Sequence, residues 1–193
     1  DNALVTIFHE LLDRSEVMTR QALREIPEGT YRAVDWLDND GVELDKPIRI
    51  EVAVTIRDGA MHVDFTGTSP QVRGPLNCVP SGSLAGACYA IRALTDPKIP
   101  TNGGCFRPIS LHLPEGTIVN PREPAPVNAR TATIKRITGT IINALADVMP
   151  DRVPAPSAGQ MVIVAFGGRL PSGKPFVTGD LLAGGSGASR GAD

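Results

Sequence analysis

Residues 48–65 read IRIEVAVTIRDGAMHVDF, and this stretch predicts a β-hairpin. Apolar side chains occupy every second position from residue 48 to residue 56, which is typical of a strand with one buried face. Asp58-Gly59 then favours a type I′ turn, because both central positions of that turn need positive φ. The alternation resumes from residue 61 to residue 65. Together with residues 30–37, the hairpin indicates a sheet of three antiparallel strands.

The hairpin ends in Asp64 and runs into a polar loop over residues 66–77. Val63 and Phe65 continue the apolar pattern, so Asp64 should point to the opposite face of the sheet. The loop offers hydroxyl groups, an amide and flexible backbone for a ligand at Thr66, Gly67, Ser69 and Asn77. A turn held by Asx and Ser/Thr side-chain caps fits the same residues. Residue types alone favour the turn and leave a ligand site open.

The remaining periodic segments indicate three helices and further strands. Spacings of three and four between apolar residues predict a helix over residues 4–26, which Pro27 ends. We expect two more helices at about residues 81–94, capped by Ser81 or Ser83, and at about residues 131–149. Strands are expected at residues 110–113, 161–166 and 176–182. Helices and antiparallel strands in separate runs indicate an α+β fold, with antiparallel sheets and about three packed helices.

The length of the chain, 193 residues with 41% apolar content, is enough for a buried core. We expect a single α+β unit over residues 1–193, with a candidate sub-boundary at residues 114–131. Prolines stiffen residues 120–126 within that stretch, so it could link two halves.

Charge and hydropathy exclude several classes of partner. The formal net charge is only -2, and acidic and basic residues are interspersed, so the basic stripe of a nucleic-acid-binding protein is missing. No apolar run has the length of a membrane span, and the first residues do not read as an export signal. We therefore expect no nucleic acid, no membrane and a cytoplasmic location.

The cysteines and histidines predict no metal site in this chain. Cys78, Cys88 and Cys105 lack CxxC spacing, which argues against a disulfide framework or a zinc ribbon and fits a reducing cytoplasm. The three histidines are far apart in the sequence and show no ligand spacing. His62 and His112 alternate with inward-facing strand residues, so they should face solvent or a partner.

Several ordered motifs give the chain a resemblance to a known family. The polar loop is followed by IPTNGGCFRPI at residues 99–109, by Pro114-Glu115-Gly116 and Asn120-Pro121, and by residues 127–130 and 182–188. This order resembles the hydantoinase B/oxoprolinase family over nearly the whole chain. The resemblance implies a fragment, lacking the N-terminal part, of the B subunit of an ATP-dependent N-methylhydantoinase or 5-oxoprolinase. Acetone carboxylases are relatives of that family.

The resemblance also implies partners. The expected ones are a hydantoinase A-type subunit or domain with an ATPase-like fold and a small cyclic amide, such as a hydantoin or 5-oxoproline. ATP and Mg would belong to the A part, and a divalent metal is expected, if anywhere, in the missing N-terminal part of the B subunit. This fragment is expected to bind no cofactor, to be inactive alone and to belong to an oligomer.

Within the mechanism that the resemblance implies, the chemistry of particular residues suggests roles for them. In the implied mechanism the A part activates the ring carbonyl with ATP and the B part directs water onto that carbon. Asp64 would be a base, and Asn102 with Arg107 would position a substrate carboxylate. Cys105 is a candidate nucleophile, since Arg107 could lower its pKa. Arg130 could supply positive charge.

Alternatives remain for these residues and for the whole chain. Arg107 could form a structural ion pair, and Arg130 could lie on a solvated helix face. The chain could be a non-catalytic scaffold that binds the A part or builds an oligomer interface. It could also belong to an acetone carboxylase-like enzyme, which would need metal and bicarbonate.

Overall fold

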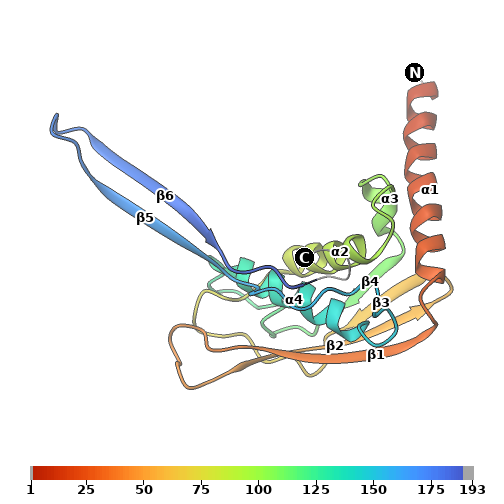
Figure 1. Ribbon diagram of the computed structural model, residues 1–193, viewed down its shortest axis with the longest axis horizontal. Coiled ribbons are helices and arrows are strands. Elements are labelled where there is room, and N and C mark those ends of the chain that lie inside the picture. The colour runs from red at the N-terminus through yellow and green to blue at the C-terminus, as the bar shows by residue number, and fades with distance from the viewer. Residues whose placement is uncertain (1, 189–193) are drawn as a thin grey trace. The chain divides into compact units, whose positions relative to one another are not determined.

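The computed structural model describes residues 2–188, which contain helices and strands in two compact units (Figure 1). The first unit covers residues 1–153 and the second covers residues 154–193. Residues 114–131 therefore lie inside the first unit. Whether the chain folds as a single unit stays a prediction.

A four-stranded sheet forms the centre of the first unit. Its strands are β1 (Gly29–Leu37), β2 (Ile48–Arg57), β3 (Ala60–Asp64) and β4 (Ile109–His112), in the order β1-β2-β3-β4. The first three strands are antiparallel neighbours, as predicted. β4 pairs with β3 in parallel, which the sequence did not predict. A parallel neighbour needs a long crossover, and here the crossover contains two helices.

Two helices cover one face of this sheet (Figure 1). They are α2 (Pro80–Leu94) and α4 (Arg130–Ala144), and the alternate residues of β2 and β3 that face them are buried. The two helices approach closely at Gly86, where a Cβ atom would lie 3.1 Å from the carbonyl oxygen of Ile134. An ion pair of 2.8 Å between Arg136 and Asp35 joins α4 to β1. The α+β fold with three long helices is confirmed.

The start of α2 differs from the prediction. Its N-cap is Val79, which makes no side-chain capping hydrogen bond, so the predicted cap by Ser81 or Ser83 was wrong. The Ser83 hydroxyl instead donates to the carbonyl of Val119, 2.8 Å away inside the core. The Ser83 side chain, which the local pattern assigned to the cap, thus makes a tertiary contact instead.

Helix α1 (Asn2–Arg24) is buried only in its second half. Ala22 and Leu23 lie in the core, whereas the apolar residues of the first turns are exposed, Phe8 by 57%. A short helix, α3 (Gly103–Phe106), packs against α1. α3 was not predicted, because four residues are too few for a periodic signal. No helix in the described part of the chain is long and apolar enough to cross a membrane.

The second unit contains one antiparallel hairpin, β5 (Met161–Arg169) and β6 (Pro175–Ala183). Both strands were predicted. Every residue of β6 is exposed to solvent.

Candidate functional site

Asp64 is the last residue of β3, and its carboxylate closes a turn. Asp64 Oδ1 accepts hydrogen bonds from the Thr66 hydroxyl at 2.6 Å and from the Thr66 amide at 2.8 Å. The Thr66 hydroxyl is the main reason that the pKa of Asp64 lies below its usual value; the Thr66 amide and the nearby His112 and His62 act in the same direction, against partial burial. Asp64 is therefore an ionised and weakly basic group at neutral pH.

Asp64 belongs to a group of polar side chains on the face of the sheet that α2 and α4 leave open. We call this group the sheet-end cluster: His62 and Asp64 of β3, with Ser110 and His112 of β4. Register places Ser110 beside His62 and His112 beside Asp64. His62 Nδ1 lies 2.9 Å from the Ser110 hydroxyl. Both histidines are exposed, as predicted. The sequence could not place β4 beside β3, so it did not show this neighbourhood.

In the loop after Asp64, side chains form hydrogen bonds to the backbone of β2. The Thr68 hydroxyl donates to the carbonyl of Glu51 and accepts from its amide, both at 3.1 Å. Ser69 Oγ accepts from the amide of Arg49 at 2.8 Å. Gly67 has φ +95, and a Cβ there would lie 2.0 Å from Glu51 Oε2, so the turn requires glycine. Thr66 and Gly67 are exposed, whereas Ser69 is engaged with β2.

Asn77 is fully buried and holds the loop together. Its side-chain oxygen accepts from the Val72 amide at 2.8 Å. Its amide nitrogen donates to the carbonyls of Val72 at 2.8 Å, Gly74 at 3.2 Å and Pro126 at 3.0 Å. Both polar atoms of the Asn77 side chain are therefore hydrogen-bonded within the loop, and Asn77 has a structural role. Neither atom is left free for the predicted contact with substrate.

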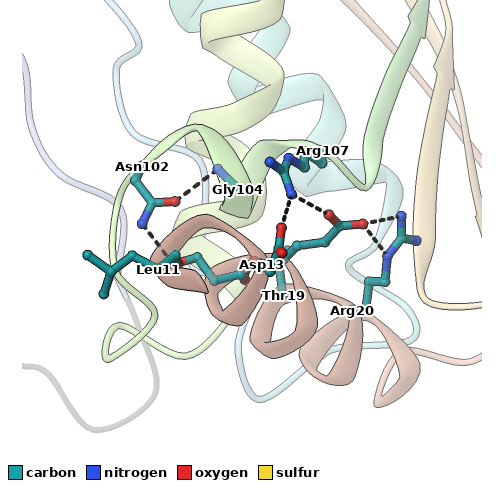
Figure 2. Close-up of polar contacts among 9 residues, drawn as sticks. Leu11, Asp13, Thr19, Arg20, Asn102, Gly104 and Arg107 are labelled. Atoms are coloured by element: carbon teal, nitrogen blue, oxygen red, sulfur yellow. Dashed lines mark hydrogen bonds and ion pairs between the residues drawn. The ribbon is translucent and has the colours of Figure 1, made fainter. Parts of the chain in front are cut away.

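Asn102 and Arg107 both reach helix α1, as Figure 2 shows. Asn102 Nδ2 donates to Ser15 Oγ at 2.8 Å, and its Oδ1 caps α3 by accepting from the Gly104 amide at 2.9 Å. Arg107 Nη1 lies 2.6 Å from Asp13 and 3.1 Å from Glu16. We call these five residues, Asp13, Ser15, Glu16, Asn102 and Arg107, the α1 clasp.

The charges of the α1 clasp stabilise one another. The hydrogen bond from Arg107 to Asp13 is the main reason that the pKa of Arg107 is raised, with Glu16 second. The pKa of Glu16 is lowered, first by Arg20 and then by Arg107. The structural ion pair that the sequence left open for Arg107 is therefore present.

Cys105 lies inside the packing beside α1. It is fully buried and clusters with Ala22 and Ile99. Its thiol donates to the carbonyl of Asn102 at 3.0 Å. A nucleophile must reach its substrate, so the catalytic role of Cys105 would need this packing to open.

Arg130 is the first residue of α4, and its side chain is exposed. Its guanidinium donates to the carbonyl of Val127 at 3.3 Å. Burial raises the pKa of the Cys78 thiol, and the positive charge of the nearby Arg130 offsets part of that increase.

The predicted site residues therefore fall into separate groups. Asp64 pairs with His112 at the carboxyl end of β3 and β4, whereas Met61 pairs with Ile109 at the other end. Arg107 precedes Ile109, so it is at least three strand residues, or about 10 Å, from the level of Asp64. A single pocket lined by Asp64, Asn102 and Arg107 is not formed. In the described residues, no group of three or more His, Cys, Asp or Glu side chains is placed to hold a metal ion.

Comparison with known proteins shows to which family the chain belongs. The hydantoinase B/oxoprolinase family matches residues 1–193. The chain belongs to this family. It is 40% identical over 170 residues to an uncharacterized protein of Methanocaldococcus jannaschii, covering 88% of this chain and 29% of that protein. It is 32% identical over 148 residues to the caprolactamase subunit beta of Pseudomonas jessenii, covering 76% of this chain and 25% of that subunit.

Solved structures share the fold of this hydantoinase B-type chain. The ATP-dependent caprolactamase from Pseudomonas jessenii matches with a TM-score of 0.80 and 27% identity, over 94% of this chain and 31% of that one. Acetone carboxylase matches with a TM-score of 0.71 and 19% identity, over 84% of this chain and 24% of that one, which shows the fold alone. The chain thus spans less than a third of the length of these relatives.

Proposed function

We propose that the chain is part of the B subunit of an ATP-dependent cyclic amide hydrolase. The observation that carries this proposal is the likeness to an ATP-dependent caprolactamase at 27% identity over 94% of the chain. The substrate class is a small ring containing an amide, such as a lactam, a hydantoin or 5-oxoproline. The partner is a hydantoinase A-type subunit that uses ATP and Mg, and the complex acts in the cytoplasm.

In the proposed reaction, the γ-phosphoryl group of ATP passes to the oxygen of the ring carbonyl in the A-type subunit. Water then attacks the carbonyl carbon, the ring C–N bond breaks, and phosphate leaves. The sheet-end cluster is our candidate for the polar surface that receives this water. Because the pKa of Asp64 is lowered, its ionised carboxylate suits orientation of a water or a histidine better than proton abstraction.

A scaffold role is the second candidate, and a specific observation favours it. The α1 clasp engages Asn102 Nδ2 with Ser15 and Arg107 Nη1 with Asp13 and Glu16. The family motif at residues 99–109 would then position α1 rather than bind substrate. All chemistry would lie in other parts of the full-length subunit.

Kinetics of the full-length subunit with its A-type partner separate these candidates. Asp64→Ala, Asn102→Ala and Arg107→Ala are compared for ATP turnover stimulated by caprolactam, hydantoin or 5-oxoproline. Arg122→Ala and Asp38→Ala are matched controls, because Arg122 forms another exposed ion pair, with Glu115, and Asp38 is exposed.

Catalysis predicts that Asp64→Ala assembles normally and loses at least about tenfold in turnover. A scaffold predicts that the Asn102 and Arg107 variants weaken assembly and leave the turnover of the assembled complex unchanged. If ATP turnover requires bicarbonate and no cyclic amide stimulates it, the proposed hydrolase activity is wrong and the complex is a carboxylase.

A further inference from the structure

Asp64 and His112 are neighbours on the open face of the sheet. The parallel register of β3 and β4 sets them side by side, and it sets His62 beside Ser110 two residues earlier. Adjacent strands lie about 4.8 Å apart, so the two side chains project from neighbouring positions. The charge of His112 helps to lower the pKa of Asp64, which agrees with this closeness. A carboxylate and an imidazole thus lie together on one surface.

The carboxylate of this pair is fixed in place. Asp64 Oδ1 accepts two hydrogen bonds from Thr66, at 2.6 and 2.8 Å. On the other side of β3, Asp64 pairs with Ala53 of β2, whose methyl group cannot ionise. The immediate neighbour of Asp64 that can take up a proton is therefore His112, with His62 placed diagonally on the same strand as Asp64.

The two histidines differ in their contacts. His62 Nδ1 lies 2.9 Å from the Ser110 hydroxyl. The ring of His112 is exposed and makes no hydrogen bond to another residue that the structure describes. A nitrogen of the His112 ring is therefore open to a water or a substrate, beside an acid that is already held.

We propose that His112 is the base that takes a proton from the attacking water, and that Asp64 is the residue that positions it. This inference rests on the proposed function and adds the identity of the base. Imidazole suits this role, because a histidine with an ordinary pKa of about 6.5 is largely neutral at pH 7. The ionised Asp64 carboxylate would stabilise the imidazolium that forms.

The proton transfers balance over the ring opening. The water oxygen bonds to the phosphorylated carbonyl carbon while His112 takes one water proton, and the ring nitrogen keeps its own. The C–N bond then breaks with its electron pair going to the ring nitrogen, which receives the proton from the imidazolium. The remaining hydroxyl proton passes to solvent, and a second water cleaves the acyl phosphate.

Chemical rescue tests His112 in the full-length subunit with its A-type partner. Mass spectrometry of the ring-opened product is measured with whichever of caprolactam, hydantoin and 5-oxoproline the unmodified complex opens. His112→Gly should lose about a hundredfold or more in turnover, and added imidazole should restore a part that grows with its concentration. His9→Ala is the control, because His9 is an exposed histidine of α1 and its variant should respond to neither change.

A double-mutant cycle tests Asp64. Asp64→Asn should cost about tenfold or more in the unmodified subunit and much less in the His112→Gly subunit, because Asp64 acts through the imidazole. A residue that only supports the fold would cost the same in both backgrounds.

The outcomes separate this inference from the function on which it rests. A complex that opens no cyclic amide would overturn both. If the complex opens the ring, then an unchanged rate in His112→Gly, a lost rate that imidazole does not restore, or rescue seen in His62→Gly in place of His112→Gly would overturn the assignment of the base alone. Equal losses for Asp64→Asn in the two backgrounds would overturn the role of Asp64.

Discussion

Single side chains decide how the loops of this protein are held. Asn77 and Asp40 are buried, and every described hydrogen bond of their side chains goes to the backbone. Such contacts explain why polar residues that resemble binding groups in the sequence are structural in the folded chain.

Gly104 allows α3 to lie close against the backbone of α1. A Cβ at Gly104 would lie 1.9 Å from the carbonyl oxygen of Leu12, whereas one at Gly103 would meet only a side-chain carbon at 3.8 Å. We expect Gly104→Ala to lower the free energy of unfolding by about 1–3 kcal/mol, and Gly103→Ala to change it far less. Urea denaturation of the two variants measures the difference, and equal stabilities would contradict the close contact.

Asp40 should contribute a pH-dependent stability. Hydrogen bonds from the backbone amides of Glu43, the largest cause, and of Val42 and Gly74 lower the pKa of Asp40, against burial. Because the pKa is lower in the folded state, the stabilisation is present above the unfolded value of about 3.9 and is lost as the pH falls through the folded value.

Replacement of Asp40 by Asn tests this. The Asn side chain keeps one acceptor oxygen but places its NH₂ group against a backbone N–H group, and two donors cannot bond to each other. Asp40→Asn should therefore lower the free energy of unfolding by about 1–3 kcal/mol at neutral pH. The loss should shrink in acid, where Asp40 itself becomes protonated. Thermal melts from pH 7 to pH 2, with exposed Asp38→Asn as the control, measure this; a loss that is constant with pH would disprove the assignment.

Elements are joined in this protein by a few polar contacts as well as by the core. The α1 clasp connects α1 with the two ends of α3, where Asn102 is the N-cap and Arg107 the C-cap. Ser15 and Asn102, which it joins, are 87 residues apart in the sequence. One side chain thus both begins a helix and joins it to another. The apolar side chains in the first turns of α1, such as Ile7 and Phe8, are exposed.

Asn102 should matter mainly as the cap of α3. Asn102→Ala removes the acceptor for the Gly104 amide, and we expect a loss of about 1 kcal/mol in unfolding free energy. Asn102→Asp keeps that acceptor and should lose less. If both variants unfold at the urea concentration of the unmodified chain, the cap contributes nothing to stability.

At the scale of the whole molecule, the core belongs to the first unit alone. The main cluster of buried apolar residues extends from Leu23 to Met149 and includes no residue of the hairpin. We therefore expect a chain ending at Val153 to unfold cooperatively with nearly the midpoint of the 193-residue chain. Circular dichroism during heating compares the two, and a truncated chain without a cooperative transition would contradict the division into units.

Local patterns were enough to predict most elements of this chain. Alternation in residues 48–65 and helical spacing in residues 4–26 reflect the period of one strand or one helix, which neighbouring residues alone encode. The three long helices, the hairpin of β2 and β3, and the separate strands β5 and β6 followed from such periods. Several ordered motifs, among them residues 99–109, suggested the family.

Only the tertiary structure decided which elements are neighbours. β4 lies parallel to β3, and this separates Asp64 from Arg107 and brings His112 beside Asp64. Arg107 turned toward Asp13 of α1, a residue 94 positions earlier. Pairings over such distances depend on how the whole chain packs, and no local period records them. For that reason the sequence predicted the elements and several functional groups, while the fold determined which of those groups share a site.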